Sequence, residues 1–148
     1  FLIDSNNMAA FKLVIGTKEG RTVQKDLQEP NTKMFLGKKI GDSVKGEDTG
    51  IAELAGYELI IAGGSDYCGF PMRADVSGVA RKRILAVSGI GMRKLAKGMK
   101  QRKTVCGNTI HAKISQINLK VTKAGPADIA PFVDKKKKEA AAEAAPAQ

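Results

Sequence analysis

Lysine and arginine side chains gather between residues 81 and 103, and no acidic side chain lies among them. The nine cations of this basic segment are Arg81, Lys82, Arg83, Arg93, Lys94, Lys97, Lys100, Arg102 and Lys103. Cations packed this densely repel one another unless a polyanion neutralises them. We therefore interpret these residues as contacts to the phosphates of a nucleic acid. A solvated basic face is the plainer alternative.

The charge of the whole chain is distributed just as unevenly. Residues 76–127 hold 12 basic and no acidic side chains, whereas residues 1–75 hold 9 and 11, and residues 128–148 hold 4 of each. The net charge of +10 thus comes from the middle third, which favours a polyanionic partner over a general basic excess. Aromatic residues make up 5% and Trp is absent, so stacking platforms for single strands are few. This composition favours a folded nucleic acid held through its backbone.

Residue types that support catalysis or metal binding are scarce. Cys68 and Cys106 lie far apart outside any C-x-x-C pair, and His111 is the only histidine. One histidine cannot complete a zinc set with them, nor does it form a recognisable catalytic triad. We predict two free thiols, with a disulfide between them as the less favoured alternative, and no catalytic residue, no metal, no cofactor and no small-molecule substrate. The sequence thus predicts that the protein is not an enzyme.

A second unusual segment is rich in glycine and ends on Pro-Met. The residues of this signature segment that we single out are Gly63, Gly64, Asp66, Gly69, Phe70, Pro71 and Met72. Glycine allows positive φ or close backbone approach, and an aspartate caps the amides of a turn. The aromatic and methionine side chains are expected to fold back on the core. A phosphate-cradling loop is the rival, but no Gly-Lys-Ser/Thr follows, which favours a structural turn.

The signature segment carries a resemblance to a known family. Residues 61–72, read as an apolar and a small residue, Gly-Gly-x-Asp, two further residues and Gly-x-Pro-Met, resemble the signature of the small-subunit ribosomal protein S6e family of eukaryotes and archaea. The likeness extends to residues 35–42 and to residues 102–110, and it covers roughly residues 8–123. The chain is similar to the short archaeal form. The resemblance implies a structural protein bound to ribosomal RNA.

The elements that must position these residues are short strands. Apolar runs and turn residues predict a hairpin over residues 11–27, strands at 40–45 and 57–61, and an alternating strand at 117–122. One or two helical turns are expected at residues 30–36. Residues 81–87 and 101–105 form the arms of a basic hairpin, with a possible turn of helix at its tip. We predict a mainly β protein with a single small barrel-like domain.

Composition divides the chain into three parts. Residues 1–7 are interpreted as an extension or a start-site artefact, and residues 8–126 as one β-rich RNA-binding domain. Residues 127–148 are rich in Lys and Ala and predict a flexible, disordered tail, because they offer no apolar face to bury. Apolar runs are too short to span a membrane.

These observations lead to one functional prediction and two alternatives. We expect a structural constituent of the small ribosomal subunit in the cytoplasm, acting in translation and bound to ribosomal RNA and neighbouring ribosomal proteins. One alternative is an RNA-modifying or nucleotide-using enzyme built on Gly63–Met72. The other is a free nucleic-acid-binding regulator.

Overall fold

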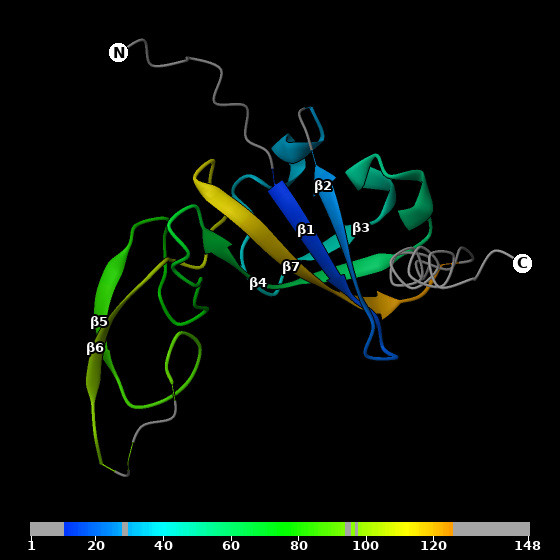
Figure 1. Ribbon diagram of the computed structural model, residues 1–148. Helices are drawn as coiled ribbons and strands as arrows, with labels where there is room; N and C mark the ends of the chain where they lie inside the picture. Colours follow the sequence, from blue (N-terminus) through cyan, green and yellow to red (C-terminus); the bar gives the residue numbers. More distant parts are fainter. Residues whose placement is uncertain (1–10, 28–29, 94–95, 97, 126–148) are drawn as a thin grey trace, which may run out of the picture.

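Seven strands form two sheets in the computed structural model, which describes residues 11–27, 30–93, 96 and 98–125. Five of them pair in the order β2-β1-β7-β4-β3 (Figure 1). Their bounds are β1 Phe11–Gly16, β2 Thr22–Leu27, β3 Ser43–Lys45, β4 Glu58–Asp66 and β7 Ile114–Lys123. The other two, β5 (Lys82–Ala86) and β6 (Gln101–Val105), pair only with each other. The mainly β fold is confirmed.

Helical structure in the described part of the chain is limited to three 3-10 helices. They are η1 (Asn31–Phe35), η2 (Glu47–Thr49) and η3 (Ala52–Leu54). The first confirms the helical turn predicted at residues 30–36, and the other two lie between the strands predicted at residues 40–45 and 57–61. None of the helices in the described residues is long and apolar enough to cross a membrane.

Alternation of apolar and polar residues explains the first hairpin. Phe11, Leu13 and Ile15 are buried on one face of β1, while Lys12 between them is exposed. β2 pairs antiparallel with β1 along its whole length, as the sequence predicts. The other edge of β1 pairs in parallel with β7, a contact between segments about a hundred residues apart. β2 and β3 are the edges of this open, twisted sheet (Figure 1), so the described pairings do not close the predicted barrel.

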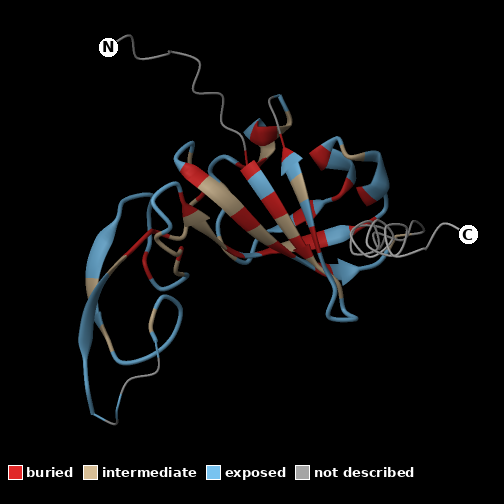
Figure 2. Ribbon diagram, in the orientation of Figure 1, coloured by how far each residue is buried: buried red, intermediate tan, exposed pale blue. Residues whose placement is uncertain are grey.

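One apolar core supports the five-stranded sheet. Leu13, Ile15, Leu59, Ile61 and Ile117 have no exposed surface, and η1 adds Phe35 to the same cluster. We call this sheet with η1–η3 the body, and the pair β5–β6 the ribbon. Buried residues gather in the body, whereas exposed residues dominate the ribbon, which extends to one side of it (Figure 2).

Candidate nucleic-acid interface

The predicted basic hairpin is present as the ribbon, and its cations face solvent. Seven of the nine cations of the basic segment fall among the described residues, and all seven are exposed. Lys94 and Lys97 lie outside the described residues, and the described residues between 93 and 100 are not helical, so the turn of helix considered at the tip is not seen in them. Among these seven described cations of the basic segment, Arg81 alone forms an ion pair, and its partner is Asp66. The other six therefore keep their positive charge without an acidic neighbour.

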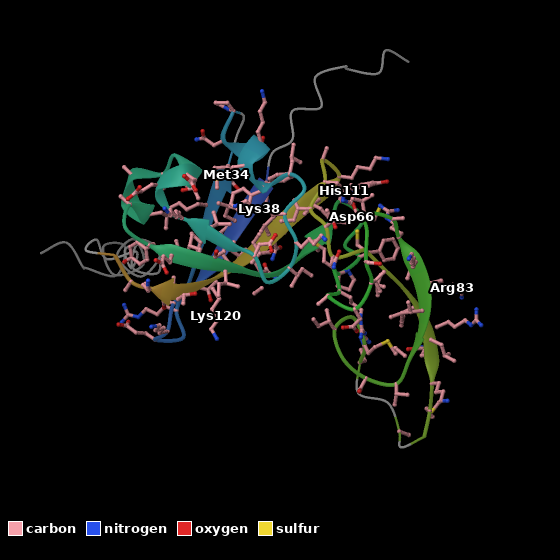
Figure 3. The ribbon with its side chains drawn as sticks, turned by 180° about the vertical axis from the view of Figure 1, so that it is seen from behind. Met34, Lys38, Asp66, Arg83, His111 and Lys120 are labelled. Carbon is pink, nitrogen blue, oxygen red and sulfur yellow. The ribbon has the colours of Figure 1, made fainter. Side chains whose placement is uncertain are left out.

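Strand register sorts these cations onto two faces of the ribbon. Directly opposite residues of an antiparallel pair share a face, and Arg83 lies opposite Thr104, while Leu85 lies opposite Arg102. Arg83, Leu85 and Arg102 consequently share one face, which we call the arginine face. Figure 3 shows Arg83 pointing away from the body.

The opposite face of the ribbon carries lysines instead. Lys82 lies opposite Val105, and Lys103 lies opposite Ile84. Ile84 is half-buried, whereas Leu85 on the arginine face is 57% exposed. The arginine face is thus the more exposed one. It presents arginines, whose guanidinium groups can donate two parallel hydrogen bonds to one phosphate.

The signature segment differs from the predicted turn in where it begins. Gly63 and Gly64 lie inside β4, where they pair with Asn118 and Ile117 of β7 at an irregularity in the register. The predicted strand ended at Ile61, which is wrong by five residues. Glycines interrupt the apolar pattern that marks a strand, and only the facing strand reveals that pairing continues.

The structure gives different reasons for glycine at the three signature positions. A Cβ added to Gly64 would lie 2.4 Å from the carbonyl oxygen of Gln116, so no larger residue fits there without movement. Gly69 has a φ of 81°, which favours glycine in the turn after β4. Gly63 shows neither feature, since its φ is not positive and nothing lies within 4 Å of an added Cβ. Close approach and positive φ are therefore confirmed for two of the three.

Asp66, at the end of β4, links the signature segment to the ribbon. Its carboxylate is buried, Oδ2 accepts a hydrogen bond from Nε of Arg81 at 2.6 Å, and Nη2 of Arg81 forms an ion pair with the same oxygen, also at 2.6 Å. The guanidinium also lies 4.8 Å from the ring centre of Tyr67 and 5.1 Å from that of Phe70. The hydrogen bond to Asp66 raises the pKa of Arg81 above its usual value. Asp66 also caps the turn as predicted, because Oδ1 accepts the N–H of Tyr67 at 2.5 Å.

Backbone hydrogen bonds complete the joint between body and ribbon. Met72 N–H donates to Gly64 at 2.9 Å, and Cys106 N–H donates to Pro71 at 2.9 Å. Met72 folds into the core as predicted, whereas Phe70 stays half-buried against Arg81. The Cys106 thiol is buried beside the Val79 carbonyl, 3.8 Å away, and burial raises its pKa. Cys68 is exposed and both thiols are free, as predicted.

Two residues near this joint were missed by the sequence analysis. Tyr67 lies in the turn after β4, and its amide also donates to the carbonyl of Lys113, at 3.1 Å. The second missed residue is Lys113. Tyr67 and Lys113 line the same groove as Arg81 and His111, and only the folded chain brings them together. An aromatic residue inside a polar, glycine-rich turn is the one signal that could have drawn attention to Tyr67. No spacing in the sequence connects it with Lys113.

A β-sheet body with an exposed, acid-free basic arm defines a class of basic proteins suited to binding polyanions. Comparison with known families makes this more specific. The chain belongs to the ribosomal protein S6e family, whose model matches residues 11–134. The predicted resemblance is confirmed, and because this is a family of ribosomal structural proteins, the enzyme built on Gly63–Met72 is not supported.

Curated relatives cover most of the chain. A protein of Methanocella arvoryzae named "Small ribosomal subunit protein eS6" is 43% identical over 137 residues, which are 91% of this chain and 94% of the relative. Relatives of the same name from Methanococcus maripaludis and Archaeoglobus fulgidus are 43% and 44% identical over 121 and 117 residues, or 81% and 78% of this chain and 93% and 88% of each relative. All three are archaeal, in agreement with the predicted similarity to the short archaeal form.

Proposed function

We propose that this protein is a structural constituent of the small ribosomal subunit in the cytoplasm and that its ribbon binds ribosomal RNA. The observation that carries the proposal is the set of six exposed cations of the basic segment, four of them on the ribbon, that have no acidic partner among the described residues. The names of the relatives support the small subunit as the site of assembly. Neighbouring ribosomal proteins are expected to contact the body, which forms the bulk of residues 8–126.

The arginine face is the expected contact surface. Arg83 and Arg102 lie on one face of adjacent strands, and a guanidinium can donate two parallel hydrogen bonds to one phosphate. Leu85 between them is exposed and can pack against ribose. Arg81 has a different role, because its guanidinium already donates a hydrogen bond to Asp66. We assign Arg81 to anchoring the ribbon and the other cations to binding phosphate.

RNA titration at several salt concentrations tests this proposal. Arg83→Gln with Arg102→Gln should flatten the dependence of log affinity on log salt by about 1.4 to 1.8, at 0.7 to 0.9 per lost phosphate contact. The matched control is Lys18→Gln with Lys33→Gln, two exposed lysines on the body. An unchanged slope for the arginine pair, or an equal change for the lysine pair, would remove the ribbon from the interface.

Assembly needs a second measurement. Tagged wild-type and arginine-pair chains should compete for incorporation into small subunits separated by sedimentation, and the variant should be under-represented. A chain that binds RNA but never sediments with small subunits would instead favour the free regulator.

A further inference from the structure

A groove opens where the turn after β4, the start of the ribbon and the approach to β7 meet. Its volume is about 390 Å³, and its walls are Asp66, Tyr67, Val79, Ala80, Arg81, His111 and Lys113. Figure 3 shows Asp66 and His111 on the same side of the molecule as the base of the ribbon. We propose that this groove holds one unpaired nucleotide of the bound RNA, with its base against Tyr67. The inference rests on the proposed function, because it specifies which feature of the RNA is recognised.

Tyr67 is prepared for stacking before any ligand arrives. Its amide is held by Asp66 Oδ1 and by the Lys113 carbonyl, and the Arg81 guanidinium lies over its ring. The side chain nevertheless remains 61% exposed, so much of its surface is available. An aromatic ring held in place loses little conformational entropy when a base stacks on it. In a chain with 5% aromatic residues, this ring supplies the stacking surface that composition alone argued against.

The charges around the groove suit a phosphate. Arg81 and Lys113 are cationic, and His111 contributes a half-buried imidazole. The one acid of the wall, Asp66, is buried, and both carboxylate oxygens accept internal hydrogen bonds. Lys113 therefore remains as positive charge that the wall does not balance, and no Asp or Glu occurs between Asp75 and Asp128.

The main chain of the wall can contribute to recognition as well. Val79 and Ala80 are exposed and lie outside any strand, so their backbone groups do not take part in strand pairing, although the Val79 carbonyl accepts a hydrogen bond from the Cys106 thiol. Backbone N–H and C=O groups commonly bind the edges of unstacked bases beside an aromatic ring. Together the ring, the cations and this stretch of backbone offer contacts for the face of a base, for its phosphate and for the edge of the base.

Stacking on Tyr67 requires an unpaired nucleotide. A base inside a duplex is covered on both sides by its neighbours, and it reaches a protein ring only after leaving the stack. A bulged or loop nucleotide has already left the stack. The ribbon would then bind the RNA backbone next to this nucleotide, while the groove binds its protruding base.

Tyrosine fluorescence gives a direct measurement, because the chain has two tyrosines and no Trp. Tyr57 is the other tyrosine, so the tyrosine fluorescence of a full-length Tyr57→Phe chain comes from Tyr67 alone. The probes are a short RNA duplex with one bulged adenosine, the same duplex fully paired, and AMP. The bulged RNA should quench the fluorescence, whereas the paired RNA should bind through the ribbon without quenching.

Substitutions separate stacking from anchoring. Tyr67→Ala should weaken binding of the bulged RNA about tenfold, the usual size of a lost base–aromatic stack, and leave the paired RNA unchanged. Tyr67→Phe keeps the ring and should bind like the unsubstituted chain. Phe70→Leu is the matched control, since Phe70 also contacts Arg81 but does not line the groove. The Phe70→Leu variant should keep the preference for the bulged RNA over the paired RNA.

Two results would overturn the inference while leaving the proposed function intact. Tyr67→Ala could weaken both RNAs equally, or neither RNA could quench the fluorescence although both bind. AMP could also quench the fluorescence at the same concentration as the bulged RNA does. That result would assign the groove to free nucleotides and would overturn its proposed role in binding RNA. If neither RNA bound at all, the proposed function itself would fail.

Discussion

The body and the ribbon contain similar strands but are stabilised in different ways. Leu13 and Ile15 of β1 have no exposed surface, whereas Leu85 of β5 is 57% exposed. β1 is flanked by β2 and β7, while β5 and β6 have only each other. An isolated two-stranded hairpin is marginally stable in water. The ribbon therefore depends on its joint with the body and on whatever binds its cations.

This difference separates two roles within one small chain. The body, with its single core, holds the joint at a defined place, and the ribbon extends the basic side chains away from it (Figures 1 and 2). Because the ribbon buries little apolar surface, its cations can be changed with little loss of folding free energy. Changes in the body should act in the opposite way, on stability first and on binding only as a consequence.

Removing the charge of the ribbon loop should give the largest effect and test this separation directly. The fourfold change to Gln covers Arg93, Lys94, Lys97 and Lys100, of which Lys94 and Lys97 lie outside the described residues. The slope of log affinity against log salt should flatten by about 3, at 0.7 to 0.9 per lost phosphate contact, which is a loss of about a thousandfold in affinity near ~0.1 M salt. Urea denaturation should show an unchanged free energy of unfolding.

Four body lysines provide the control for that experiment. Lys12, Lys18, Lys33 and Lys39 are all exposed, and their joint change to Gln removes the same charge. If the salt slope flattened equally in the two variants, RNA binding would depend on the net charge of the protein and not on the ribbon. The body and the ribbon would then not differ in their contribution to binding.

The second prediction concerns stability and uses two adjacent glycines. Gly64→Ala places a methyl group 2.4 Å from the Gln116 carbonyl oxygen and 3.1 Å from the Met72 sulfur. Such overpacking should lower the free energy of unfolding by about 1–3 kcal/mol. Gly63→Ala, with open space around the new methyl group, should change it by less than about 0.5 kcal/mol. If Gly64→Ala melted normally but lost RNA, the glycine would serve approach to RNA instead.

The third prediction loosens the joint and leaves the body folded. Arg81→Ala removes the partner of the buried Asp66 carboxylate and the cation over Tyr67 and Phe70. The base of the ribbon should open more often, and the buried Cys106 thiol should then react faster with an alkylating reagent in a Cys68→Ser background. Lys82→Ala, which removes the neighbouring exposed cation, should leave that rate unchanged. Equal rates in both variants would show that Asp66–Arg81 does not hold the joint.

The smallest effect is expected from truncation after Gly125. Lys135–Lys138 are balanced by Asp128, Asp134, Glu139 and Glu143, so residues 128–148 have no net attraction for RNA. We expect the shortened chain to fold and to enter the small subunit, with at most slower association through lost steering. Full-length and shortened chains competing for incorporation will measure this. Exclusion of the shortened chain would make the tail an anchor and the ribbon insufficient.

Local patterns in the sequence were enough to predict much of the body. The apolar run before Gly16 and the turn residues after it predicted the first hairpin, and alternation from Ile117 onward predicted most of β7. These elements depend on neighbouring residues, so their pattern is visible in one stretch of chain. The basic hairpin was predicted for the same reason, because Arg83 and Arg102 belong to short runs that end at glycine-containing turns.

Contacts between distant segments were decided by the tertiary structure alone. The parallel pairing of β1 with β7, the continuation of β4 through Gly63 and the pairing of Arg81 with Asp66 each join residues that no local pattern connects. Charge belongs to the side chain itself, so the sequence by itself determined that this protein carries an acid-free basic segment. Which cations face outward and which one is an anchor depends on packing, since a buried carboxylate binds whichever cation the fold brings to it.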